Sequence, residues 1–158
     1  HCSKTGKMLR SAIYSYYRKC GDRYLYQKFA KLMTAIKDLD NVSERGKRTV
    51  YQGLKTTDGK KLLSSFVFGK ISSAKDFIKK TSYDNGISVQ LNTPLTLPSL
   101  HLVSILPNYE SYRFEVQEEK VSADNGIFTF DSYFHEEEAL QFVAIYDGEE
   151  ILGMGFLG

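Results

Sequence analysis

Hydrophobic residues in the first 40 positions recur every three or four residues, which is the period of an amphipathic helix. One such stripe predicts a helix over residues 4–20, with Gly21 as its C-terminal cap. A second stripe predicts a helix over residues 22–40, with Asp22 as its N-terminal cap. The stripes consist of Met8, Leu9, Ala12, Ile13, Tyr16, Tyr17 and Cys20, and of Leu25, Phe29, Leu32, Met33, Ile36 and Leu39. The short link between them predicts an antiparallel helix pair, each helix with one apolar face to cover.

The following stretch has no clear period. Its charged segment, residues 43–48, could begin a short third helix through Val50 and Tyr51, with Ser43 as the cap. The pair Asp58-Gly59 indicates a turn. An apolar patch at residues 62–68 is compatible with either a helix or a strand.

From about residue 76 the hydrophobic period changes to two, which is typical of strands. The pattern predicts strands at residues 77–83, 87–91, 100–106, 112–121, 127–130, 140–146 and 151–157. Asn85-Gly86 predicts a tight hairpin turn, because Asn and Gly tolerate the positive φ angles of such a turn. Asn125-Gly126 and Asp147-Gly148 are further turn signals. The segment 153–155, Gly-Met-Gly, indicates a bulge or a close backbone contact within the last strand.

Helices followed by strands predict an α+β fold, in which an N-terminal antiparallel helix pair precedes an antiparallel β-sandwich of about seven strands. We expect a basic helical hairpin and linker at residues 1–60 and an acidic antiparallel β-sandwich at residues 61–158. A chain of 158 residues is short enough for both parts to form one compact unit.

The charge of the chain reverses near the change of period. Residues 1–80 hold 19 basic and 6 acidic residues, a net charge of +13. Residues 81–158 hold 2 basic and 13 acidic residues, a net charge of −11. A molecule with one basic and one acidic part attracts the opposite part of a neighbour. The leading hypothesis is therefore a structural, self-assembling subunit.

In this hypothesis a basic helical surface of one copy docks on an acidic β surface of the next. Such a contact uses two different patches, so it closes into a ring or propagates as a filament. The basic surface consists of Lys4, Lys7, Arg10, Arg18, Lys19, Arg23, Lys28, Lys31, Arg45, Lys47 and Arg48. The acidic surface consists of Glu115, Glu118, Glu119, Asp131, Glu136, Glu137, Glu138, Glu149 and Glu150.

Two other functions fit the same residues. The basic helix pair could bind the phosphates of a nucleic acid, although no known nucleic-acid-binding motif accompanies it. The β-sandwich could also be a surface module that binds a ligand, with the helices as a stalk. A solvated helix face would carry the same lysines and arginines without any partner.

The sequence contains no motif for catalysis, so we expect no enzymatic activity and no catalytic residue. The histidines, His1, His101 and His135, lack partners at metal-ligand spacing. His135 stands beside Glu136, Glu137 and Glu138, which we interpret as a solvated acidic turn. We therefore expect neither a metal nor a cofactor. Cys2 and Cys20 are expected to be free thiols, with an intermolecular disulfide as the alternative.

No apolar run approaches the roughly 18–20 residues of a membrane span. The sequence begins with His1 rather than Met, so a secretion signal could have been removed. We expect an extracellular or cell-surface location in that case and a cytoplasmic one otherwise.

The first 55 residues also resemble a known family. The segment 6–10, Gly-Lys-Met-Leu-Arg, leads into the helix pair, and the segment 43–50, Ser-Glu-Arg-Gly-Lys-Arg-Thr-Val, follows it. This order resembles an uncharacterised family of bacterial proteins with an N-terminal helix pair and a β-rich C-terminal part. The resemblance implies that order of elements and a bacterial origin, and it implies no activity.

Overall fold

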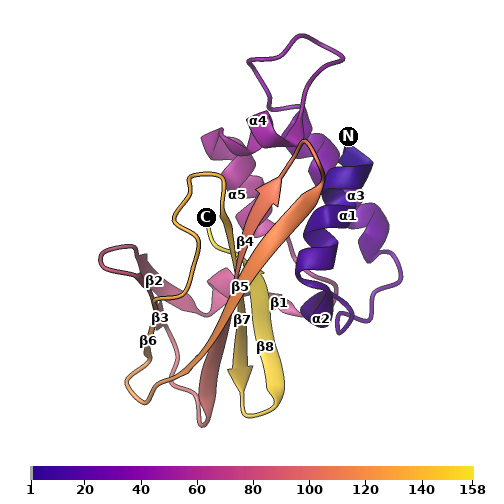
Figure 1. The fold of residues 1–158 in the computed structure, drawn as a ribbon. Helices are drawn as coiled ribbons and strands as arrows, with labels where there is room; N and C mark the ends of the chain where they lie inside the picture. The colour runs from indigo at the N-terminus through magenta and orange to yellow at the C-terminus, as the bar shows by residue number, and fades with distance from the viewer. Residues whose placement is uncertain (1) are drawn as a thin grey trace.

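The computed structural model describes residues 2–158 and has a mixed α+β architecture (Figure 1). Its helices are α1 (Cys2–Ala12), α2 (Tyr14–Tyr17), α3 (Leu25–Lys37), α4 (Val50–Leu54) and α5 (Thr57–Ser65), followed by a 3₁₀ turn, η1 (Ala74–Asp76). Its strands are β1 (Ser72–Ser73), β2 (Ile78–Ser82), β3 (Ile87–Leu91), β4 (Pro98–Asn108), β5 (Arg113–Ser122), β6 (Ile127–Phe130), β7 (Leu140–Asp147) and β8 (Glu150–Phe156). The predicted order of helices followed by strands is confirmed.

The strands form two sheets. A five-stranded sheet has the order β1-β8-β7-β4-β5, and a three-stranded sheet has the order β2-β3-β6. Every pair is antiparallel except β1 with β8, which is parallel. The predicted sandwich of about seven strands is not confirmed, because the described strands number eight and divide into sheets of five and three.

The strands β4 and β7 of the five-stranded sheet are buried on both of their faces, whereas the edge strand β5 is largely exposed. On β4, Leu100 and Leu102 pack with residues of β3 and β6, whereas Val103 and Ile105 pack with residues of the helices. The residues of β7 divide between the same two clusters. A strand that is covered on both faces needs apolar residues at nearly every position. This explains the continuous apolar run at residues 142–145.

Phe68 joins the helical layer to the sheet. It is fully buried, and its ring lies 6.2 Å from that of Phe29 on α3 and 5.7 Å from that of Phe142 on β7. The ambiguous patch at residues 62–68 is thus divided between the end of α5 and an extended segment. Because α5 spans residue 60 and shares this cluster, the two expected parts of the chain have one common core.

Several boundaries in the helical part differ from the prediction. The helix expected at 4–20 is divided at Ile13 into α1 and α2. The next helix begins at Leu25, because Asp22 accepts a hydrogen bond from the Tyr24 N–H in a turn and does not cap the helix. Gly21 has a positive φ of 65°, but the C-cap of α2 is Arg18, so Gly21 lies in the link to α3 and does not cap the helix.

A short third helix is present, but it begins at Val50 and not in the charged segment 43–48, and its predicted cap was wrong. The side chain of Thr49, not of Ser43, accepts the hydrogen bond from the Gln52 N–H. The turn predicted at Asp58-Gly59 was also wrong, since both residues lie in the first turns of α5. There the Thr56 hydroxyl caps the helix by accepting from the Gly59 N–H.

The turn signals in the β part had mixed outcomes. Asn85 and Gly86 have φ angles of 53° and 125° and join β2 to β3 as predicted. Gly126, at a φ of 74°, instead connects β5 to β6, which lie in different sheets. The close contact predicted in the last strand is confirmed, because a Cβ on Gly153 would lie 2.9 Å from Cδ2 of Phe77.

Candidate functional site

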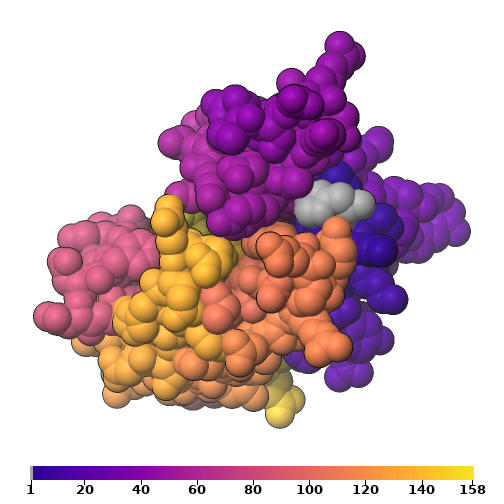
Figure 2. All heavy atoms as spheres, turned by 45° about the horizontal axis from the view of Figure 1, so that its top comes forward, coloured from indigo at the N-terminus to yellow at the C-terminus, as the bar shows by residue number. Residues whose placement is uncertain are grey.

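A pocket of about 440 Å³ lies where the helical part meets the loop between β6 and β7. We call it the seam pocket. Figure 2 shows the surfaces that surround this region: the purple helical segments meet the amber β6–β7 loop, and the pink β2–β3 hairpin lies beside them. The lining residues of the pocket that carry polar or aromatic side chains are Tyr51, Lys55, Lys60, Tyr83, Tyr109, Tyr133, Phe134, His135, Glu136, Glu137, Glu138 and Gln141.

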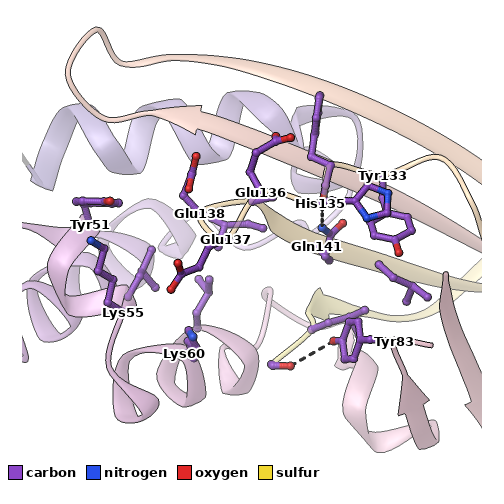
Figure 3. A pocket seen from close by; sticks show the side chains of 18 of the residues that line it. Tyr51, Lys55, Lys60, Tyr83, Tyr133, His135, Glu136, Glu137, Glu138 and Gln141 are labelled. Carbon is purple, nitrogen blue, oxygen red and sulfur yellow. Dashed lines mark hydrogen bonds between the residues drawn. The ribbon is translucent and has the colours of Figure 1, made fainter. Parts of the chain in front are cut away.

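Two pairs of aromatic rings contribute to the walls. Tyr51 of α4 and Tyr109, which follows β4, have ring centroids 5.1 Å apart at an angle of 41°. Tyr133 and His135 of the β6–β7 loop have centroids 4.2 Å apart at 36°. Figure 3 shows Tyr51 at one end of the pocket and the second pair at the other end, near Tyr83. The Tyr83 hydroxyl donates a hydrogen bond to the Gly158 carbonyl at 3.3 Å.

Charges of both signs lie between the two aromatic pairs. Lys55 and Lys60 project from α4 and α5 on one side, and Glu136, Glu137 and Glu138 lie on the other (Figure 3). The Lys55 ammonium lies 4.2 Å from the centroid of the Tyr51 ring. A hydrogen bond with Tyr51 and the charges of Glu137 and Glu138 raise the pKa of Lys55 above its ordinary value. Lys55 therefore stays charged at neutral pH.

Gln141 of β7 lies in the middle of the view in Figure 3 and carries a hydrogen-bond acceptor without a partner. Its Nε2 donates to the Phe134 carbonyl at 3.2 Å. Because a carbonyl can only accept, this contact fixes the orientation of the amide. Oε1 of Gln141 is buried and receives no hydrogen bond from any described group of the protein. A buried acceptor without a donor costs about 1–3 kcal/mol.

The loop that carries most of these side chains is itself anchored. The Phe134 N–H donates to the buried Ser104 hydroxyl at 2.9 Å. The Glu119 carboxylate accepts from the N–H groups of Asp131 and Ser132 at 2.9 and 2.8 Å. These contacts tie the loop to β4 and β5 and hold this wall of the pocket in place.

The predicted acidic residues lie on three elements, and the Glu119 side chain of one contacts the backbone of Asp131 in another. Glu136, Glu137 and Glu138 line the seam pocket, near Asp131 in the same loop. Glu149 and Glu150 lie at the β7–β8 hairpin, and Glu115, Glu118 and Glu119 lie on β5. Neighbouring residues on a strand face opposite sides of the sheet, so Glu118 and Glu119 do not share a face.

The predicted basic residues lie on the helices and the loop before α4. Lys4, Lys7 and Arg10 are on α1, Arg18, Lys19 and Arg23 lie between α2 and α3, and Lys28 and Lys31 are on α3. Arg45, Lys47 and Arg48 lie in the loop between α3 and α4, which projects at the top of Figure 1.

Ion pairs in residues 2–158 are local. The pairs within 4.0 Å are Lys28–Asp22, Lys37–Asp38 and Lys47–Glu44, and each lies wholly in the basic half of the chain. Other cations lie over aromatic rings, as Lys4 does over Tyr112 and Lys19 over Tyr146. Of the described residues, none forms an ion pair between the basic half and the acidic half within that distance.

A second polar cluster lies at the centre of the molecule. The hydroxyl of the buried Tyr16 lies 2.7 Å from Oε1 of Glu118 and 3.0 Å from Nδ1 of His101. The His101 ring stacks on Tyr146 with centroids 4.3 Å apart. Burial, followed by the charge of Lys120, lowers the pKa of His101, and burial raises the pKa of Tyr16. The cluster connects α2 to β4 and β5 and has a structural role.

Sequence reasoning identified only the acidic part of the seam pocket, as a solvated turn beside His135. It missed Tyr51, Lys55, Lys60 and Gln141, which come from segments that are distant in the sequence. The only signal in the sequence was the abundance of tyrosine, with 11 residues in the chain.

The structure places both cysteines as free thiols, with Cys20 buried. Within residues 2–158, no group of three His, Cys, Asp or Glu side chains is arranged to hold a metal ion. No helix in the described part of the chain is both long enough and apolar enough to pass through a membrane.

The resemblance of the first 55 residues to an uncharacterised bacterial family stays a prediction. Comparison with protein-family models, with curated proteins and with solved structures found no match to this chain.

Proposed function

We propose that this protein is a ligand-binding module and that the seam pocket holds a small polar molecule. The observation that carries the proposal is the lining of this pocket, where two pairs of aromatic rings lie beside side chains of both charges. The volume of about 440 Å³ lies within the range of small-molecule sites. Aromatic walls with a few convergent polar groups are also typical of such sites.

The anchored loop supports the same proposal. Binding costs less when the site does not have to order itself around the ligand. The hydrogen bonds of Phe134 with Ser104 and Gln141 hold the backbone of the loop beside the pocket.

A screen by NMR tests the proposal. The probes are a mixed library of small sugars, amines, carboxylic acids and amino acids, added to the ¹⁵N-labelled protein. We expect at least one class to shift the amide signals of residues 133–141 and the Gln141 side-chain signals. In Gln141→Met these shifts should weaken by at least about tenfold in Kd, since the hydrogen bond that ties Gln141 to the Phe134 carbonyl beside the pocket is lost.

The matched control is Gln117→Met, because Gln117 is an exposed glutamine on β5 that does not line the seam pocket. It should bind as the unmodified protein does. If no probe shifts the pocket signals at millimolar concentration, or if Gln141→Met binds unchanged, the seam pocket is not a ligand site.

Self-association is a second candidate function, favoured by a different observation. No described ion pair within 4.0 Å joins the two halves of the chain, so the charges that lie outside the seam pocket are available to a second copy. Binding of a nucleic acid by the basic helices stays a prediction. Retention of DNA on a column, measured beside the salt dependence of self-association, tests it.

A further inference from the structure

We infer that the ligand of the seam pocket is a neutral saccharide. This inference rests on the proposed function and adds to it the chemical class of the ligand. It follows from two properties of the walls: the mixture of charges and the two separated aromatic pairs.

The mixture of charges argues against a ligand with a single net charge. An anion that approaches Lys55 and Lys60 also meets the carboxylates of Glu136, Glu137 and Glu138, and a cation meets the two ammonium groups. A hydroxyl group donates one hydrogen bond and accepts others. A molecule with several hydroxyls can therefore donate to the carboxylates and accept from the lysines at the same time, without a repulsive contact.

A zwitterion also meets this mixture of charges, because its ammonium can face the carboxylates and its own carboxylate can face the lysines. For this reason a zwitterionic dipeptide is included as a probe below.

The aromatic pairs decide between these two ligands. The faces of a sugar ring carry aliphatic C–H groups, which pack against aromatic rings by dispersion and burial of apolar surface. The Tyr51–Tyr109 pair and the Tyr133–His135 pair lie at opposite ends of the pocket (Figure 3). A disaccharide or longer oligosaccharide can place one ring against each pair, whereas a small amino acid leaves one pair uncovered.

Titration with probes of matched size tests the inference. The neutral probes are disaccharides and trisaccharides of glucose, galactose, mannose and xylose. The charged probes are chitosan oligomers, oligogalacturonates and a zwitterionic dipeptide. We expect at least one neutral probe to shift the signals of residues 133–141, and the charged probes to bind at least tenfold more weakly.

If amines, acids or the dipeptide shift these signals and no neutral saccharide does, the inference is wrong while the proposed ligand site stands. If none of the probes and no member of the mixed library binds, both are wrong. The two failures are therefore distinguishable.

Substitutions in the aromatic pairs give a second measurement. Tyr133→Ala should weaken saccharide binding at least tenfold, and the exposed His135→Ala provides the same test should Tyr133→Ala fail to fold. Tyr14→Ala is the matched control, because Tyr14 is a 62% exposed tyrosine on α2 that does not line the seam pocket. Equal affinity of all three variants would overturn the inference.

Discussion

Asp40 is a buried carboxylate that organises the loop between α3 and α4. It accepts hydrogen bonds from the N–H groups of Val42 and Ser43, at 2.9 Å each, and of Thr49, at 3.0 Å. One side chain thus joins the start of the loop to its end, and it holds Arg45 and Lys47 between these points. Burial raises the pKa of Asp40, but the hydrogen bonds from Ser43, Thr49 and Val42 together lower it well below its ordinary value.

Because of Asp40, we expect the folded protein to lose stability in acid. The folded protein binds a proton at Asp40 less readily than the unfolded chain, whose aspartates have a pKa of about 3.9. The stability that Asp40 contributes is therefore complete above about pH 5 and is lost as the pH falls through about 4 and below. We expect Asp40→Asn to lower the free energy of unfolding in urea at pH 7. The difference from the unmodified protein should shrink at pH 3, and an equal difference at both pH values would contradict the prediction.

Tyr16 gives a second prediction about a single residue. Tyr16→Phe removes a hydroxyl that lies within hydrogen-bond distance of both Glu118 and His101, and it should lower the free energy of unfolding by about 1 kcal/mol. Tyr14→Phe should change it by less than about 0.5 kcal/mol, because Tyr14 is largely exposed. Chemical denaturation of the two variants checks this. Equal effects would show that the Tyr16 hydroxyl does not connect the helices to the sheet.

At the scale of elements, two glycines allow the short helices to pack closely. A Cβ on Gly53 would lie closer than 2.5 Å to the Ile36 carbonyl oxygen, and a Cβ on Gly59 equally close to the Gly53 carbonyl oxygen. The backbone of α4 therefore lies directly against the end of α3, and α5 lies directly against α4. Sequence reasoning took Asp58-Gly59 for a turn because glycine usually marks one. Here the glycine is needed for a close approach inside a helix, which only the packed structure reveals.

Gly53→Ala should accordingly destabilise the protein by about 3 kcal/mol or prevent it from folding, since the neighbouring atoms are backbone and cannot move aside. It should also displace Tyr51 and Lys55, which lie on or beside the same helix. Gly126→Ala is the control. Its added methyl meets nothing within 4 Å, and the positive φ alone costs about 1–2 kcal/mol. Thermal unfolding separates the two, and similar melting temperatures would show that the close packing of α4 is not required.

The strands were better predicted than the helices. Each of the seven predicted strands has a counterpart, because alternation and turn residues are local signals. Their division into two sheets could not be predicted, since β4 pairs with both β5 and β7 and the period of two does not specify partners. The seam pocket was missed for the same reason: its walls are brought together by these long-range pairings.

At the scale of the whole molecule, the opposite charges of the two halves predict salt-dependent self-association. At low salt and high concentration we expect light scattering to report species larger than the monomer. They should dissociate at ~0.5 M salt, which screens charges beyond a few ångströms. Reversing Arg45, Lys47 and Arg48 to Glu should weaken the association if this loop is in the contact.

The matched control is the reversal of Lys79 and Lys80, two exposed lysines on β2 outside the predicted basic surface. Self-association should persist in this variant. A protein that stays monomeric at low salt, yet retains DNA on a column, would favour the nucleic-acid function instead. If the protein neither self-associates nor retains DNA, then neither a second copy of the chain nor a nucleic acid is the partner of its charged surfaces.

The position of β8 has a consequence for how the chain folds during synthesis. β8 lies between β1 and β7 in the sheet. It is synthesised after both of them, so the last strand of the sheet must enter at an interior position. The helices are made first, and their apolar faces pack against Phe142, Met154 and Phe156 of β7 and β8. On the ribosome, these faces therefore remain without their native cover until the end of β8 has left the exit tunnel. During that interval the nascent helices are a natural substrate for chaperones that bind exposed apolar segments.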